Sequence, residues 1–231
     1  MTRRKMAAGE TNDRTADPFA SARAAILPVA LDAAAFEGFS RAAIDKAAGA
    51  AGLDAATARA AFPGGGIDLI DFWSARADAT AAPALGGPHA PSRVRERVAC
   101  AVEARLFYFA PHKEAARRAA AIHAAPPNAP RAARLVWRAS DAIWRALGDK
   151  STDGNYYSKR AILSGVVAQT QARWLADDDP GFAATRAFLA DRINDVMRFE
   201  KLKAAVSKRA PDPAAVVGAL ARLRHPRGRA G

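Results

Sequence analysis

The chain has 231 residues, of which 50% are hydrophobic, and a formal net charge of +12. Its single cysteine, Cys100, excludes an internal disulfide framework and fits a reducing compartment. No apolar stretch approaches the roughly 20 residues that a membrane-spanning helix needs. The four histidines are scattered, none lies at metal-ligand spacing with another ligand, and no Glu-x-x-His pair occurs. We therefore expect no metal, no cofactor and no catalytic site.

The positive charge is concentrated at the C-terminus. Residues 201–231 hold eight Lys or Arg and one acidic residue, a net charge of +7, whereas residues 24–82 have a net charge of −3. Residues 1–19 mix both signs and contain no apolar core, so we expect a disordered leader rather than a targeting peptide. Roughly a quarter of the chain is alanine, which favours helix and adds little buried area per residue.

Apolar residues at helical spacing predict an all-α protein, with no alternating β segment. The first helix is expected over about 20–35, with Pro28 either kinking it or moving its start. Ser40 and Asp54 are good N-caps for the second and third helices. A glycine connector at 64–66 then precedes a fourth helix, which completes a front unit over residues 20–82.

A stretch rich in Pro and Gly, residues 81–91, marks the boundary before a larger helical body over 91–200. Further helices are expected around 94–109, after Pro111 to 122, and around 136–147 and 163–174. Asp179 followed by Pro180 is typical of an N-cap with proline in the first turn, and predicts the start of the last helix of the body.

The run from Gly148 to Leu163 is not explained by helix caps alone. It contains two adjacent tyrosines, Tyr156 and Tyr157, followed by Lys159 and Arg160. Successive helical side chains diverge by roughly 100°, so at least one tyrosine is expected on the surface, with cations within reach. An exposed aromatic residue beside cations is typical of a binding hot spot. A tyrosine that simply covers the start of the helix is an equally open interpretation.

The same run resembles the signature of the ubiquinone-biosynthesis lipid-binding proteins, a family with a TetR-like all-helical fold. Trp144, residues 188–194 and residues 62–65 also match, and the resemblance covers about residues 23–203. It implies a helical bundle with an N-terminal helix-turn-helix-like unit and a larger body that holds a ligand cavity. It also implies a helper protein, not an enzyme, that presents a quinone precursor to the membrane-bound di-iron hydroxylase of the pathway.

The resemblance implies a contact patch for that hydroxylase. Many relatives carry Trp-Tyr where this chain has Tyr156-Tyr157, and Thr where it has Ser158. The aromatic character is kept. The expected partner-binding residues are Asp153, Asn155, Tyr156, Tyr157, Lys159 and Arg160.

Large apolar residues stand out against the alanine background of the body, and any single one of them is most simply explained as core. As a set, large rings bordered by alanines leave room between helices, where bundles often bind ligands. The resemblance implies a cavity for an isoprenoid quinone precursor or a phospholipid. The candidate lipid-binding residues are Phe107, Phe109, Trp137, Ile143, Trp144, Leu163, Val167 and Trp174.

The basic tail over 201–231 contains a short amphipathic segment flanked by cations, a pattern that favours an anionic membrane surface over a solvated tail. We expect a cytoplasmic protein that is peripheral on the inner membrane. A homodimer is expected from the fold resemblance. The candidate membrane-contact residues are Val216, Val217, Leu220 and Leu223.

The front unit follows the helix-turn-helix pattern of TetR-type regulators, in which the third helix reads DNA. Here that helix, 55–61, offers only Thr57 and Arg59 for contacts and lies in a unit of net negative charge. DNA recognition needs phosphate contacts and long side chains that reach base edges, so we expect no nucleic-acid partner. A TetR-class ligand-responsive transcriptional repressor remains the alternative function.

Overall fold

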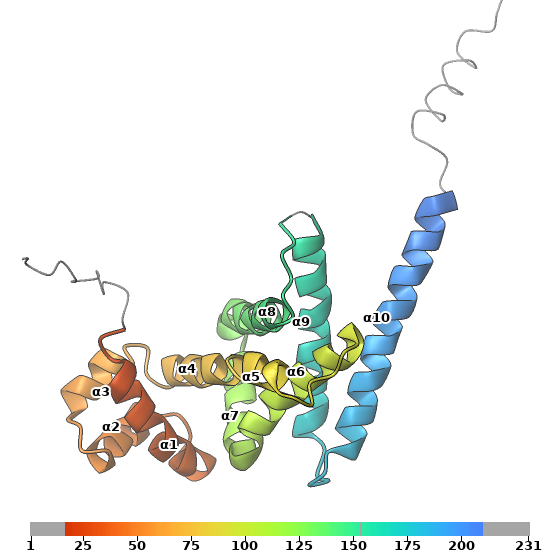
Figure 1. Cartoon of the computed structure of the whole chain (residues 1–231). Coiled ribbons are helices and arrows are strands. Elements are labelled where there is room, and N and C mark those ends of the chain that lie inside the picture. The colour runs from red at the N-terminus through yellow and green to blue at the C-terminus, as the bar shows by residue number, and fades with distance from the viewer. Residues whose placement is uncertain (1–16, 153, 210–231) are drawn as a thin grey trace, which may run out of the picture.

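The computed structural model describes residues 17–152 and 154–209, and this part of the chain is entirely helical. The expectation of an all-α protein is confirmed. Ten α-helices are joined by short turns and by two 3₁₀ turns, Ala110–His112 and Pro126–Asn128. In Figure 1 the first three helices lie at one side of the molecule and the last helix lies at the opposite side.

The front unit forms as its caps predict. The Ser40 hydroxyl accepts a hydrogen bond from the Ala43 amide at 3.1 Å, and the Asp54 carboxylate accepts one from the Thr57 amide at 2.6 Å. The first helix continues through Pro28 to its end beside Gly38. The four helices are α1 (Ala20–Glu37), α2 (Arg41–Ala50), α3 (Ala55–Ala61) and α4 (Gly66–Asp78).

The glycine connector before α4 is required by close packing. A Cβ atom on Gly66 would overlap the carbonyl oxygen of Phe39, so only glycine fits at the start of this helix. The connector has a structural role, as expected.

The body contains six helices, and α10 lies beside α9 along one edge of it (Figure 1). They are α5 (Ala81–Gly86), α6 (Val94–Phe109), α7 (Lys113–Ala124), α8 (Ala129–Ala146), α9 (Gly154–Leu175) and α10 (Ala183–Arg209).

The predicted boundary at 81–91 is only partly correct. Its first half is helix α5, which packs on α6 and α8 and buries Ala81 and Leu85. Pro83 is tolerated because it lies in the first turn, where its missing amide has no helical partner. The front unit and the body also share a core, since the Trp73 ring of α4 meets the Phe109 ring of α6 edge to face at 4.7 Å.

The last helix begins three residues later than Asp179-Pro180 predicts. Phe182 adopts a left-handed backbone, with φ of 54°, and the helix starts at Ala183. The Asp179 carboxylate still accepts a hydrogen bond from the Ala183 amide at 2.9 Å. The buried Asp177 accepts from both the amide and the hydroxyl of Thr185, and these hydrogen bonds lower the pKa of its carboxyl group.

The two ends of the expected layout also differ from the sequence prediction. Asp17 is part of the structured front unit, because its carboxylate pairs with Arg23 at 2.9 Å and accepts a hydrogen bond from the Phe19 amide. Residues 1–16 of the expected leader lie outside the described residues. The expected tail has no break at 201, since α10 runs on to Arg209.

Candidate functional site

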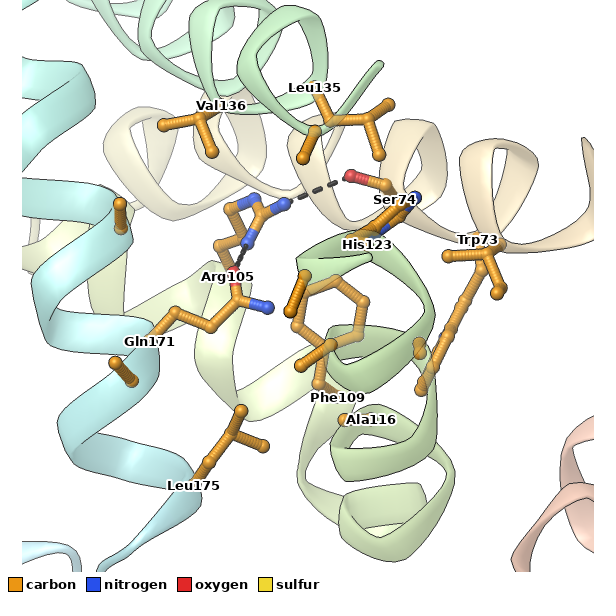
Figure 2. Close-up of a pocket in the computed structure, with 17 residues that line it drawn as sticks. Trp73, Ser74, Arg105, Phe109, Ala116, His123, Leu135, Val136, Gln171 and Leu175 are labelled. Atoms are coloured by element: carbon orange, nitrogen blue, oxygen red, sulfur yellow. Dashed lines mark hydrogen bonds between the residues drawn. The ribbon is translucent and has the colours of Figure 1, made fainter. Parts of the chain in front are cut away.

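A pocket of about 290 Å³ lies where the front unit meets the body, between α4, α6, α7, α8 and α9 (Figure 2). Its apolar wall includes Trp73, Phe109 and Leu135, which belong to three different helices. The full lining is Ile70, Trp73, Ser74, Arg105, Phe109, Ala116, Ala119, Ala120, His123, Ala124, Ala132, Leu135, Val136, Ala168, Gln171, Ala172 and Leu175.

Alanines create the space in this pocket. Seven of the lining residues are alanine, and each places only a methyl group where a larger side chain would fill the gap between helices. Ala116 and Ala119 are buried and form part of the floor, whereas Ala124, Ala168 and Ala172 are exposed and mark the open side between α7 and α9.

One buried charge stands in the wall. Arg105 of α6 is 4% exposed and donates to the Asp78 carboxylate at 2.8 Å, the Ser74 hydroxyl at 3.0 Å and the Gln171 side-chain oxygen at 2.8 Å. Its guanidinium also lies 4.9 Å from the centre of the Phe109 ring. The charge is therefore paired and hydrogen-bonded, as a buried cation must be.

A second polar group, His123 of α7, lies at the edge of the same pocket. Burial lowers the pKa of its imidazole, more strongly than Asp71 at 3.8 Å raises it. His123 is therefore neutral at pH 7. The cation that pairs with Asp68 and Asp71 is Arg131, at 2.5 and 2.6 Å. These ion pairs join α8 to α4 beside the pocket.

Only one of the eight candidate lipid-binding residues, Phe109, lines this pocket. Ile143, Leu163 and Val167 are buried in the separate core that α5, α6, α8, α9 and α10 share. They pack there with Ala81 and Leu85 of α5 and with Leu189 and Ile193 of α10.

The four remaining aromatic candidates also lie elsewhere. Phe107 is 43% exposed beside Phe182, and Trp174 is fully buried against Phe182 and the Lys113 ammonium. The Trp144 indole donates to the Lys159 carbonyl oxygen at 3.1 Å, and the Trp137 ring lies near Tyr157. Seven of the eight candidates therefore do not line this pocket, and their role in lipid binding stays a prediction.

Most residues of the pocket, including Trp73, Arg105 and Gln171, were not predicted from the sequence. One signal was present. Arg105 falls on the buried stripe of α6 between Val102 and Phe109, and a charged residue on an apolar stripe indicates an internal polar contact. The alanines gave no such signal, because alanine is common throughout the chain.

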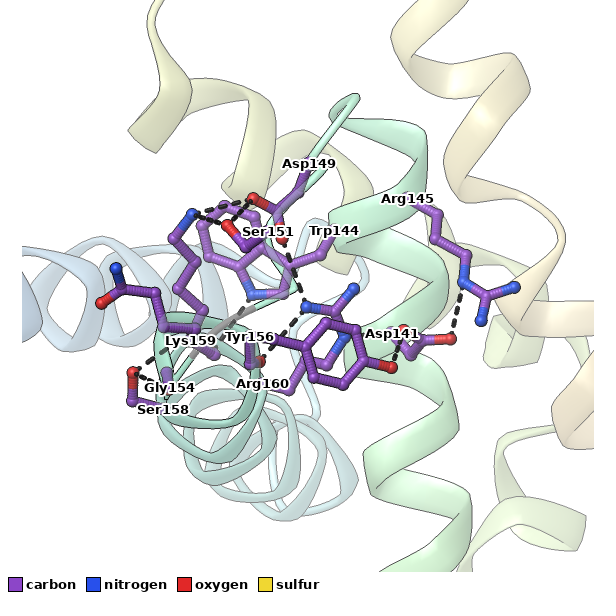
Figure 3. Close-up of polar contacts among 11 residues, drawn as sticks. Asp141, Trp144, Arg145, Asp149, Ser151, Gly154, Tyr156, Ser158, Lys159 and Arg160 are labelled. Carbon is purple, nitrogen blue, oxygen red and sulfur yellow. Dashed lines mark hydrogen bonds and ion pairs between the residues drawn. The ribbon is translucent and has the colours of Figure 1, made fainter.

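The tyrosine run forms a second site at the corner between α8 and α9 (Figure 3). α8 ends in the left-handed Gly148, and the chain then passes Asp149 before α9 begins at Gly154. Asp149 is central: its carboxylate meets the Lys159 ammonium at 2.8 Å and the Arg160 guanidinium at 3.2 Å. The hydrogen bond from Lys159 and a second from Ser151 lower its pKa to about 2.

Arg160 is buried, which corrects its assignment to a surface patch. Its side chain is 2% exposed, pairs with Asp141 of α8 at 2.6 Å and lies 3.5 Å from the centre of the Tyr156 ring. Lys159 is half-exposed and is committed to Asp149 and Ser151. Neither cation is free to meet a partner, because both hold the corner together.

The two tyrosines have different environments. The Tyr156 hydroxyl donates to Asp141 at 3.3 Å and its ring covers Arg160, so it packs over the start of α9. Tyr157 is 64% exposed, and its ring centre lies 6.3 Å from that of Trp137. The expectation that at least one tyrosine is exposed is confirmed. Asn155 is exposed as well, while Asp153 lies outside the described residues.

This second site lies within a matched region of the chain, because the COQ9 family model aligns with residues 129–200. These residues form a COQ9 domain. The domain spans α8, α9 and the first part of α10, and it contains the whole corner between α8 and α9. The family resemblance is therefore confirmed over this region.

The chain is also similar to curated proteins that bear the family's name. The chain is 40% identical over 97 residues to the ubiquinone biosynthesis protein COQ9, mitochondrial, of Rattus norvegicus, and 38% identical over 97 residues to that of Homo sapiens. These alignments cover 42% of this chain and 31% and 30% of the two relatives, so less than a third of each relative is matched. The protein of the same name from Drosophila melanogaster is 29% identical over 185 residues, which are 78% of this chain and 56% of that relative.

A solved structure supports the TetR-like fold. The TetR transcriptional regulator from Nitrosomonas europaea superposes with a TM-score of 0.56 and 22% identity, covering 77% of this chain and 97% of the regulator. The COQ9 domain and the front unit together thus follow one TetR-like helical arrangement.

The helix-turn-helix-like unit lies outside the COQ9 domain and offers little to DNA. Arg59 on α3 is exposed but pairs with Asp45 at 3.4 Å, and Thr57 is only partly exposed. The other side chains of this short helix are alanine methyl groups.

Within residues 17–152 and 154–209, no group of three or more His, Cys, Asp or Glu side chains is arranged to hold a metal ion. No helix in this described part of the chain is both long and apolar enough to cross a membrane. Val216, Val217, Leu220 and Leu223, the candidate membrane-contact residues, lie outside the described residues.

Proposed function

We propose that this chain is a non-catalytic lipid-binding protein of ubiquinone biosynthesis, which presents an isoprenoid quinone precursor to the membrane-bound di-iron hydroxylase. The observation that carries this proposal is the alanine-lined pocket in a chain with a COQ9 domain. The names of the relatives place those proteins in ubiquinone biosynthesis, which supports the same pathway here.

The size of the pocket sets how a ligand fits. Small-molecule pockets measure about 300–1,000 Å³, and this one lies at the low end with about 290 Å³. Such a volume suits one substituted ring and the first part of its chain. The rest of a long isoprenoid tail then leaves through the side marked by Ala168 and Ala172.

The exposed face of the α8–α9 corner is the proposed contact for the hydroxylase. Tyr157 and Trp137 place two neighbouring rings there, and exposed aromatic residues are frequent hot spots. Arg134 and Arg138 are exposed on the same helix as Trp137 and add positive charge. Tyr156, Lys159 and Arg160 support this face from behind rather than forming it.

Membrane attachment through the basic tail and a homodimer complete the proposal. The tail is the most positively charged part of the sequence, and such segments bind anionic lipid surfaces. The TetR-like fold supports a dimer by analogy.

The test of the lipid-binding role is mass spectrometry of an organic extract from the purified, folded protein. We expect a polyprenylated quinone precursor or a phospholipid at close to one equivalent per chain. Ala172→Trp should remove most of this lipid, because the indole blocks the open side of the pocket without overpacking the buried floor.

The matched control is Ala161→Trp, an exposed position on the same helix that does not line the pocket. It should retain the lipid. Equal lipid content in the wild type and both variants would place the lipid elsewhere and contradict the proposed site. Absence of lipid from the wild type, together with specific DNA retention, would favour the repressor alternative.

A further inference from the structure

The polar cluster in the pocket wall is not explained by binding of a hydrocarbon. A purely apolar ligand would need only rings and methyl groups, yet Ser74, Arg105 and Gln171 all reach the cavity. Ser74 and Arg105 are both 4% exposed. Burying polar groups costs free energy unless they are satisfied, so their arrangement indicates what the pocket accepts.

Arg105 fixes the orientation of the Gln171 amide. The side-chain oxygen of Gln171 accepts from the Arg105 guanidinium at 2.8 Å, so the amide nitrogen must point the other way. Figure 2 shows this nitrogen directed toward the Phe109 ring and the interior of the pocket. A fixed pair of N–H donors therefore faces the space that a ligand would fill.

The pocket offers these donors without a free charge. Asp78 neutralises Arg105 at 2.8 Å, and burial keeps His123 uncharged at pH 7. An anionic head group would have to displace Asp78 from Arg105 to be paired. A neutral oxygen atom needs no such exchange, because the Gln171 amide can donate to it directly.

We infer that Gln171 is a specificity-determining residue, whose amide donates a hydrogen bond to a carbonyl or ether oxygen on a neutral, ring-sized ligand. Phe109 and Trp73, which meet edge to face at 4.7 Å, supply the apolar wall for that ring. This inference rests on the proposed function and names the part of the ligand that the pocket recognises.

Isothermal titration with two small probes tests the inference on the full-length protein. The first probe is benzoquinone carrying one prenyl group, and the second is prenylbenzene, which has the same shape without the oxygens. The wild type should bind the quinone about 5- to 10-fold more tightly than the hydrocarbon, the effect of one hydrogen bond.

Two variants separate hydrogen bonding to the ligand from support of the fold. Gln171→Glu keeps an oxygen for Arg105 and nearly the same shape but removes the N–H donors, whereas Gln171→Leu removes both. In both variants the ratio of the affinities for the quinone and for prenylbenzene should fall to about one. A retained 5- to 10-fold preference in Gln171→Glu would overturn the inference.

The hydrocarbon probe distinguishes this inference from the proposed function. Wild-type binding of both probes with equal affinity would overturn the role of Gln171 and leave the ligand pocket intact. Wild-type binding of neither probe would remove the pocket as a ligand site, and the proposed function and the inference would fall together.

Discussion

Tyr156 and Tyr157 show how two identical neighbours acquire different roles. Helical geometry requires that they diverge, and the structure places one ring over Arg160 and the other in solvent beside Trp137. Because the residue type is the same, only the environment makes Tyr156 part of the packing at the start of α9 and leaves Tyr157 accessible on the surface. Of the described residues of the predicted patch, Tyr157 and Asn155 are the exposed ones.

Substitution of Tyr157 should weaken association with the hydroxylase and leave the fold unchanged. We expect Tyr157→Ala to reduce the affinity at least tenfold, because an exposed hot-spot ring contributes about 2 kcal/mol or more. The measurement is binding to hydroxylase reconstituted in vesicles, with circular dichroism as the check on folding. Val94→Ala, at an apolar residue of α6 that is 60% exposed, is the control. Unchanged affinity in Tyr157→Ala would contradict the patch.

At the scale of elements, the α8–α9 corner depends on a chain of charges. Arg160 on α9 pairs with both Asp141 on α8 and Asp149 in the turn. Lys159 forms a further ion pair with Asp149. Breaking such a pair leaves a buried cation without a partner, which is costly. These ion pairs hold α8 and α9 together, and the exposed Tyr157 ring lies on the corner that they stabilise.

The lowered pKa of Asp149 makes this corner sensitive to acid. The folded-state pKa is about 2 and the ordinary value is 3.8, so the stabilisation is fully present above about pH 4 and is lost as the pH falls toward 2. We expect Asp149→Asn to be less stable than the wild type at pH 7 and equally stable near pH 2. Urea unfolding at pH 7, 4 and 2.5 measures this. A constant difference across the series would show that Asp149 does not titrate as expected.

At the scale of the whole molecule, the front unit does not pack as a domain separate from the body. Its core is continuous with that of the body through Trp73 and Phe109, and Arg131 of α8 pairs with Asp68 and Asp71 of α4. The arrangement is TetR-like, and α3 carries only Thr57 and Arg59 besides alanine. The pocket lined by Trp73 and Phe109 lies at this same junction.

This arrangement predicts no sequence-specific DNA binding. Gel-shift assays with genomic fragments at about 150 mM salt should show no discrete complex, because α3 carries one cation and that cation is paired with Asp45. A TetR regulator with its own operator is the positive control. Weak retention at low salt that disappears at moderate salt is expected from the basic tail. A discrete complex at moderate salt would contradict the prediction.

The sequence by itself determined the helical class, the caps at Ser40 and Asp54 and the family of the tyrosine run, since these depend on local periodicity and short motifs. It did not determine the pocket. That cavity arises where methyl groups from α7, α8 and α9 face rings from α4 and α6, and no local pattern distinguishes these alanines from the many others. It also did not determine that Arg160 turns inward and Tyr157 outward, because burial depends on where α8 lies. Tertiary packing decided both, because cavity volume and side-chain burial depend on how several helices pack against one another and not on the sequence of any one segment.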